Sequence, residues 1–312
     1  MAAASTPRPG TIPVLAALAA FVALGAATLL ANSYYVFIIA TMAITALAGI
    51  GLNVLVGLTG QVSFGHVGFY AIGAYVVAIL TATAKISFWI ALPVATVVAG
   101  LVGALLALPA LRVRGPYLAM ITIAFGFVVE HVIVEARGLT GGQNGIMNIG
   151  QPSFFGQAYG EQGIAILSLV LAAAALYGFW RLAASPWGAA MRAVRDSEVA
   201  ASSIGLDPVA VKTLAFAVSA ALGGLAGGLF APLSGFVTPS TFSFLQSILF
   251  VLVVVIGGAG TVSGPLVGAA VVVLLPELLA SLAEYRLLLF GILLLVMLWI
   301  APTGIVGLIS SA

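Results

Sequence analysis

The residues best suited to chemistry in this chain are charged side chains gathered in one short segment. Residues 181–212 hold seven of its 18 charged residues, which comprise ten Lys and Arg and eight Asp and Glu. The seven are Arg181, Arg192, Arg195, Asp196, Glu198, Asp207 and Lys212. A chain this apolar can gather so many charges only in water, so we expect this segment to be a surface that meets a soluble partner.

The residue types needed for catalysis or metal binding are scarce elsewhere. The chain has no cysteine and two histidines, which excludes disulfides, thiolate catalysis and cysteine-based metal sites. It contains no paired carboxylates and no H-E-x-x-H, G-x-S-x-G or Walker-type G-x-x-x-x-G-K-[ST] run. We therefore predict no catalytic residue, no metal site and no cofactor in this chain. The net charge of +2 rests on too few charges to indicate nucleic-acid binding.

Helix-start signals predict how the charged segment folds. Ser185 followed by Pro186 is typical of an N-cap with proline at the first helical position, and this helix would carry Arg192 and Arg195. We name residues 185–207 the elbow and expect it to be helical.

A second short helix is predicted within the elbow. Asp196 is expected to cap a helix over 197–204, which Gly205 would end. Asp207-Pro208 repeats the cap signal and opens the next apolar span. The elbow is therefore predicted to be two short helices between two membrane spans.

Composition identifies the chain as a membrane protein. Hydrophobic residues make up 63%, charged residues 6%, and the mean hydropathy is +1.28. Apolar runs near the length of a membrane crossing predict ten spans, at 12–31, 34–57, 66–83, 88–111, 116–135, 163–183, 208–232, 243–259, 264–283 and 286–308. We expect an all-α polytopic protein of about ten transmembrane helices forming a single domain over 1–312. The first run could also be read as a signal peptide, but its length favours a retained helix.

Basic residues predict the orientation. A cytoplasmic N-terminus places seven of them inside, namely Arg8, Arg112, Arg114, Arg181, Arg192, Arg195 and Lys212, and leaves Lys85, Arg137 and Arg286 outside. This bias agrees with the positive-inside rule. Both termini and the elbow are then cytoplasmic, and the polar loop over 136–162 lies outside.

Two glycine-rich segments resemble each other at a shift of 200 residues. Gly57, Gly60, Val62, Ser63, Val67 and Gly68 recur as Gly257, Gly260, Val262, Ser263, Val267 and Gly268. The match indicates either an internal repeat or ordinary turn chemistry in a Gly- and Val-rich chain. Breaks of this kind at membrane depth often mark a transport path.

Four polar residues are candidates for that path. Gln61, Ser63 and His66 belong to the first segment, where they could bind a passing solute or satisfy the broken backbone locally. Glu277 follows Pro276 in the ninth predicted span and could face the path, or pair with Arg286 or with a partner subunit.

The segment E-V-A-A-S-S-I-G, Glu198 to Gly205, resembles the EAA loop of ATP-binding-cassette (ABC) importer permeases, although it lacks that motif's downstream apolar-Pro ending. Residues 51–75 resemble permeases of branched-chain amino acid importers. R-V-R-G-P-Y-L-A-M-I-T-I-A-F at 112–125 and L-T-G-G-Q-N-G-I at 139–146 resemble their M-type member. The match continues from 192 to 227 and covers about residues 36–275.

This resemblance implies a function and a set of partners. The chain would be the M-type permease subunit of a branched-chain amino acid ABC importer in a bacterial inner membrane. It would pair with an H-type permease, two ABC ATPases that bind ATP and Mg, and a periplasmic or lipid-anchored solute-binding protein. The second elbow helix would be a coupling helix, and the elbow as a whole would dock on an ATPase through Arg192, Arg195, Asp196, Glu198, Ala200, Ala201 and Gly205.

Two other functions stay open at this point. A related permease for urea or short amides shares much of the pattern, because the binding protein does most of the selecting. An ion-coupled secondary transporter is a different class, and the near absence of charged residues within the predicted spans argues against it.

Overall fold

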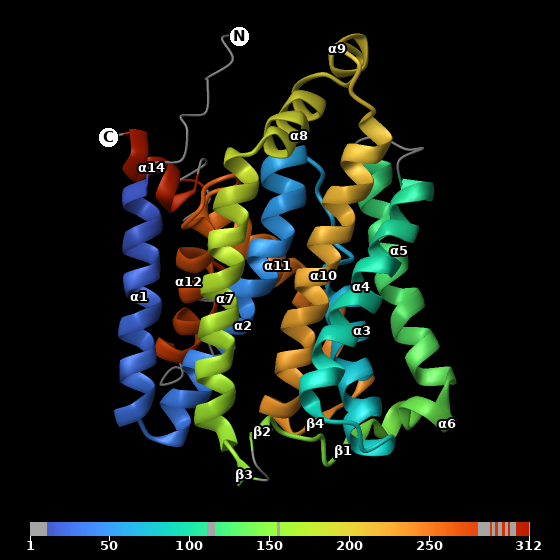
Figure 1. Cartoon of the computed structure of the whole chain (residues 1–312), viewed down its shortest axis with the longest axis vertical. Coiled ribbons are helices and arrows are strands. Elements are labelled where there is room, and N and C mark those ends of the chain that lie inside the picture. Colours follow the sequence, from blue (N-terminus) through green and yellow to red (C-terminus); the bar gives the residue numbers. More distant parts are fainter. Residues whose placement is uncertain are drawn as a thin grey trace.

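The computed structural model describes residues 11–110, 116–154 and 157–279, together with residues 288, 291, 292, 295, 296, 299 and 304–311. Long helices run side by side along the molecule, and their connections lie at its two ends (Figure 1). The long helices are α1 (Thr11–Leu30), α2 (Ser33–Asn53), α3 (His66–Ala78), α4 (Phe88–Ala110), α5 (Pro116–Glu135), α7 (Gly160–Ala184), α10 (Pro208–Ser234), α11 (Phe244–Gly257) and α12 (Gly264–Leu278).

The two ends of the bundle differ in structure. The short helices α8 (Pro186–Asp196), α9 (Glu198–Ser203) and α14 (Ile305–Ser311) lie at one end, which we name the elbow end (Figure 1). Helix α6 (Arg137–Thr140) and the strands β1 (Ile146–Met147), β2 (Ser153–Phe154), β3 (Gln157–Ala158) and β4 (Phe236–Val237) lie at the other, the loop end.

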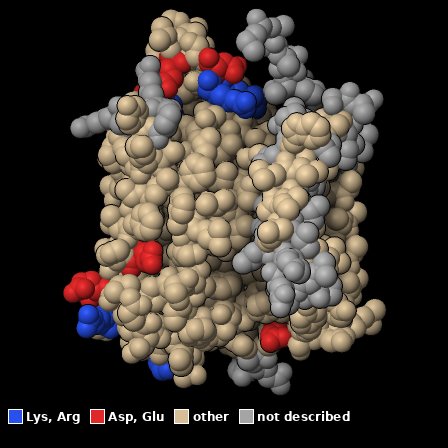
Figure 2. Space-filling view, turned by 180° about the vertical axis from the view of Figure 1, so that it is seen from behind, with Lys and Arg blue, Asp and Glu red and all other residues tan. Residues whose placement is uncertain are grey.

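The helices have the composition of a membrane domain. Seven of those described are long and apolar enough to cross a membrane: Ser33–Thr59, His66–Thr83, Phe88–Pro109, Tyr117–Glu135, Gly160–Ala184, Pro208–Ser234 and Pro239–Gly257. Two shorter apolar helices, Val14–Leu30 and Gly264–Leu278, match two more predicted spans. Figure 2 shows charged side chains gathered toward the ends of the molecule with an uncharged zone between them. The all-α polytopic fold is confirmed, whereas the count of ten is not, because the predicted span 286–308 lies largely outside the described residues.

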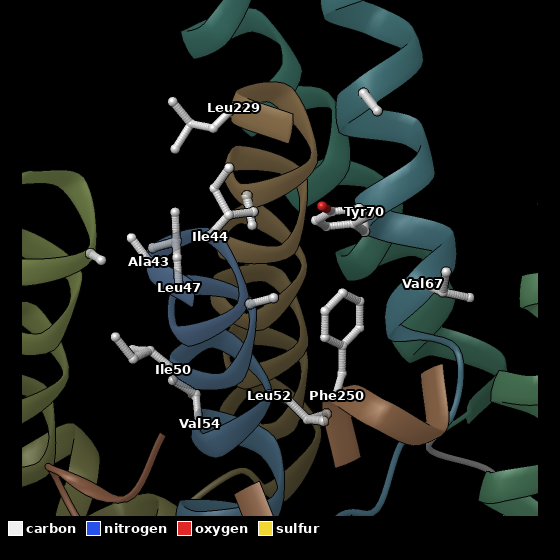
Figure 3. Packing of buried hydrophobic residues seen from close by; sticks show 14 of the residues in the cluster. Ala43, Ile44, Leu47, Ile50, Leu52, Val54, Val67, Tyr70, Leu229 and Phe250 are labelled. Carbon is white, nitrogen blue, oxygen red and sulfur yellow. The ribbon is translucent and has the colours of Figure 1, made fainter. Parts of the chain in front are cut away.

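Helix α2 forms the centre of the bundle. Apart from its first turns it is buried almost continuously, and it packs against α7, α10, α11 and α12. A helix that is apolar on every side has no face suited to water, so it takes the central position. Figure 3 shows Ile44, Leu47 and Ile50 of α2 within the same core as Tyr70 and Phe250. The rings of Tyr70 and Phe250 have centroids 5.2 Å apart.

Small residues bring α10 unusually close to α3. A Cβ placed on Gly227 would lie 1.8 Å from the carbonyl oxygen of Tyr70, and one on Gly73 would lie 1.9 Å from the oxygen of Gly224. Only glycine permits such an approach of two backbones, which is a common way for helices to associate in lipid.

Both glycine-rich segments that resemble each other interrupt helices. The first is a π-helical turn, η1 (Val54–Thr59), which ends at Gly60 with φ +68°, and regular helix resumes only at His66. The second follows Gly257, and Gly258 and Gly260 have φ +114° and +82° before α12 starts. We name residues 57–65 the first break and residues 258–263 the second break.

The predicted outer loop over 136–162 is folded at the loop end. Strand β1 pairs with β4, with Ile146 opposite Val237, and this ties the loop to the connection that follows α10. The indole nitrogen of Trp89 donates to the carbonyl of Ser153 at 2.9 Å, and Gly150 N donates to Thr81 Oγ1 at 3.1 Å. The loop is therefore held in place by neighbouring elements and is not a loose connector.

Candidate functional site

The elbow forms the first part of the candidate site. Ser185 caps α8, because its Oγ accepts a hydrogen bond from Gly188 N at 3.3 Å, and Pro186 occupies the first helical position. Both features agree with the sequence prediction. Asp207 likewise caps α10 by accepting from Val209 N at 2.9 Å.

The predicted cap of the second elbow helix was wrong by one residue. Asp196 is the last residue of α8, and Ser197 caps α9 by accepting from Ala200 N at 3.2 Å. The reason is conformational: Ser197 is extended, with φ −161° and ψ 113°, as an N-cap must be. Helix α9 therefore runs from Glu198 to Ser203. Gly205 follows in the left-handed region at φ +87°, as predicted for the residue that ends the helix.

Helix α9 exposes apolar side chains to the surroundings of the elbow end. Val199 is 76% exposed and Ile204, just after the helix, is 73% exposed. The two alanines that were predicted to dock on a partner lie on different faces of the helix, since Ala201 is buried and Ala200 is exposed. Sequence reasoning did not single out Val199 and Ile204, although apolar residues inside a polar segment were the available signal.

An ion pair fixes α9 against the membrane domain. Glu198 Oε1 accepts from Lys212 Nζ on α10, and the Lys212 side chain is only 9% exposed. The sequence had suggested that Glu198 meets a donor on a partner. In this structure the carboxylate contacts a lysine of its own chain, which positions α9 relative to α10.

Helix α8 buries Met191 and Val194 in the core, and its two arginines donate to backbone carbonyls of the bundle. Arg192 Nη1 donates to the carbonyl of Ala183 at 2.8 Å, at the end of α7. Arg195 Nη1 donates to the carbonyl of Gly57 at 2.7 Å, in the first break. A Cβ on Gly60 would lie 3.0 Å from Arg195 Cγ, so the arginine stem also runs along this segment.

The two breaks meet each other beside Arg195. Asn53, the last residue of α2, donates from Nδ2 to the carbonyl of Thr261 at 2.9 Å and accepts from Gly260 N at its Oδ1 at 2.8 Å. A Cβ on Gly57 would lie 2.5 Å from Gly260 N, so the two backbones are in direct contact. Asn53 was not predicted from the sequence. An asparagine at the end of an apolar span was the signal that could have found it.

The first break leads from the elbow end into the bundle. Phe64 N donates to Thr122 Oγ1 at 3.1 Å, and Phe64 O accepts from Ser247 Oγ. Thr122 lies six residues into α5, about 9 Å along that helix. Side chains of α5 and α11 thus satisfy a backbone that no helix satisfies.

Three of the four predicted path residues lie in or just after this break. Ser63 is buried and accepts from Gly65 N at 3.4 Å, which is a local structural role. Gln61 Oε1 and both ring nitrogens of His66 are buried without a hydrogen-bond partner among the described residues. The His66 ring stands edge-on to Phe69 and Phe250, at centroid distances of 6.2 and 6.0 Å.

Glu277 does not join this cluster. It lies 13 residues after Gly264 on α12, about 20 Å along the helix toward the loop end. Its alternative partner, Arg286, lies outside the described residues. The same holds for the basic residues Arg8, Arg112 and Arg114.

A small pocket that is open to the surroundings borders the first break. Aromatic rings dominate its wall, and Glu130 of α5 contributes a half-buried carboxylate. It is lined by Phe64, Val67, Ile123, Gly126, Phe127, Glu130, Phe242 and Phe244. In the part of the chain that the structure describes, no group of three or more His, Asp or Glu side chains could hold a metal ion.

Comparison with known proteins gives a consistent result. Residues 34–298 match the family described as branched-chain amino acid transport system / permease component. The high-affinity branched-chain amino acid transport system permease protein LivM of Salmonella typhimurium is 38% identical over 293 residues, which cover 86% of this chain and 69% of that protein. The LivM protein of Escherichia coli K12 is 37% identical over 282 residues, which cover 82% of this chain and 66% of that protein.

A second group of relatives is more distant. The permease protein LivH of Escherichia coli K12, of the same transport system by name, is 27% identical over 299 residues, covering 84% of this chain and 91% of that protein. This chain spans about two thirds of the length of its LivM relatives. No solved structure gives a significant match.

Proposed function

The chain belongs to the family of branched-chain amino acid transport permease components, and from this premise we propose that it is the M-type transmembrane subunit of an ATP-driven importer of branched-chain amino acids. Members of this family are transport subunits and not enzymes. The substrate follows the names of the LivM relatives, which are 37–38% identical to this chain.

The apolar surface of α9 carries the proposal. Val199 and Ile204 project from the elbow end of a domain whose other apolar surfaces suit lipid. Exposing apolar side chains to water outside the membrane costs free energy, and burying them in a groove of a partner would remove that cost. We infer that this partner is an ABC ATPase, and that ATP and Mg bind there and not in this chain.

The remaining assembly follows from the same proposal. An H-type permease would complete the membrane domain, two ATPases would bind the elbow ends, and a periplasmic or lipid-anchored solute-binding protein would meet the folded loop end. Lipid would cover the apolar helix faces. Among the described residues, Arg181, Arg192, Arg195 and Lys212 belong to the elbow end, against Lys85 and Arg137 at the loop end. This bias supports a cytoplasmic elbow, and cytoplasmic termini, in a bacterial inner membrane.

We place the solute path along the first break. Buried polar atoms without partners, at Gln61 and His66, suit a segment that meets a polar solute during transport. The small pocket beside this segment has an aromatic wall that also carries the Glu130 carboxylate, a suitable partner for an ammonium group. Ser63 would stabilise the conformation of this break, and Glu277 would line the solute path nearer the loop end.

Reconstitution tests the function directly. The chain is assembled in proteoliposomes with its H-type partner, ATPases and binding protein, and uptake of labelled leucine and labelled urea is measured with and without ATP. ATP-dependent leucine uptake is expected. Uptake of urea alone would assign the chain to an amide permease, and ATP-independent, ion-driven uptake would contradict the importer.

Elbow variants test the docking surface. Val199→Ser with Ile204→Ser is expected to lower leucine uptake about tenfold, because docked apolar side chains contribute much of such an interface. Ser202→Ala, a change on the same helix that keeps both apolar side chains, is the control. Unchanged uptake in the double variant would count against ATPase docking by α9.

A further inference from the structure

Three polar contacts connect the elbow to both breaks through two side chains. Arg195 of α8 holds the Gly57 carbonyl at 2.7 Å. Asn53 holds Thr261 and Gly260 of the second break through both ends of its amide, at 2.9 and 2.8 Å. Gly57 lies against Gly260, with room for no side chain between them. Elbow, first break and second break therefore share one contiguous junction.

These bonds replace partners that the broken helices do not provide. The π-helical turn ends at Thr59, so the Gly57 carbonyl has no following helical N–H to accept from. Gly260 N and the Thr261 carbonyl belong to the second break, between α11 and α12. Backbone groups in this position need partners from elsewhere in the protein. A displacement of Arg195 or Asn53 would leave these groups unpaired, so the junction favours discrete arrangements over gradual ones.

We propose that Arg195 and Asn53 are positioning residues that link movement of the elbow to the opening and closing of both breaks. Movement of α8 displaces the Gly57 carbonyl through Arg195. Asn53, whose helix continues directly into the first break, transfers that displacement to Gly260 and Thr261. This inference rests on the proposed function, because it takes the elbow as the part that an ATPase moves.

The two side chains suit this role chemically. A guanidinium keeps its charge in every setting and holds its donors in a rigid plane, so it fixes the direction of a bond to a carbonyl better than an ammonium does. Asparagine offers one acceptor and two donors on a short stem, which lets a single residue hold an N–H and a C=O of the same turn. Both residues position backbone, and neither is assigned a contact with solute.

The test uses the complete transporter in proteoliposomes and measures leucine uptake and ATP hydrolysis in the same preparation. The variants are Arg195→Gln, Arg195→Lys, Asn53→Leu and the double variant Arg195→Gln with Asn53→Leu. Arg181→Gln removes an exposed positive charge at the same end of the molecule and serves as one control. Ser168→Ala removes a buried side-chain bond within α7 and serves as the other.

Loss of coupling is the expected result. ATP hydrolysis should stay within about twofold of wild type, while leucine moved per ATP falls about tenfold in Arg195→Gln and in Asn53→Leu. Arg195→Lys should recover part of this ratio because it keeps a cation near the Gly57 carbonyl. The double variant should be no worse than either single variant, since residues in one pathway are not additive.

Two results would overturn the inference. One is a wild-type ratio of leucine to ATP in both single variants. The other is a parallel loss of uptake and hydrolysis at constant ratio, which indicates a purely structural role. ATP-independent uptake by the wild-type assembly would instead overturn the proposed function, and this inference with it.

Discussion

Glu198 of α9 and Lys212 of α10 form an ion pair across the turn that separates the two helices. The lysine side chain is 9% exposed and the glutamate side chain 31%, so the pair is partly shielded from water. It sets the position of α9, whose exposed Val199 and Ile204 form the proposed docking surface. The ion pair thus helps to orient this exposed apolar surface.

Breaking this pair should loosen α9. Glu198→Gln is expected to raise the rate of hydrogen exchange of the α9 amides. The increase should correspond to about 1 kcal/mol of lost local stability, the size expected for a partly buried ion pair. Lys212→Met, which keeps the stem, should do the same. The exchanged pair Glu198→Lys with Lys212→Glu should restore part of the protection. Unchanged exchange in both single variants would show that the pair does not hold α9.

The two alanines of the elbow motif should respond differently to added bulk. Ala200→Leu extends an exposed surface, so thermal unfolding in detergent should be unchanged while transport falls. Ala201→Leu adds volume to a site that is 1% exposed, and should destabilise the elbow by about 1–3 kcal/mol. Equal melting temperatures for the two variants would contradict the assigned faces.

The corrected cap of α9 has its own test. Ser197→Ala removes the acceptor for Ala200 N and should cost about 1 kcal/mol of local stability, visible as faster exchange of the first α9 amides. Asp196→Ala should leave these amides unaffected, because Asp196 ends α8. The reverse pattern would reinstate Asp196 as the cap.

The contact between the two breaks should leave no room for a side chain at Gly57. Gly57→Ala places a Cβ 2.5 Å from Gly260 N, and should lower the free energy of unfolding by about 1–3 kcal/mol. Gly178→Ala is the matched control on α7, where nothing lies within 4 Å of the added Cβ. This control should be neutral or stabilising by up to about 1 kcal/mol, since alanine favours helix. Similar thermal shifts for both variants would show that the breaks are not tightly packed.

The pattern of apolar runs and caps was enough to predict most of the helical framework. Membrane helices satisfy their own backbone, so their existence depends on local composition and length. The cap at Ser185, the terminator at Gly205 and the interruption of both glycine-rich segments follow from equally local chemistry. The prediction failed at Asp196, where two adjacent polar residues could each cap and only the backbone angles of Ser197 decided between them.

Contacts between distant segments were beyond the reach of the sequence by itself. Nothing local indicates that Arg195 meets Gly57, which lies 138 residues away, or that Asn53 meets Thr261 across 208 residues. Nothing local indicates that Glu198 contacts Lys212 either, because Lys212 is reached only after the chain turns at Gly205. The sequence alone therefore determined where a polar, helical elbow interrupts an apolar chain and which residues break its helices. The breaks leave some backbone N–H and C=O groups without helical partners. Only the tertiary structure decided which of these groups the arginine and the asparagine bind, because that pairing depends on how the helices assemble.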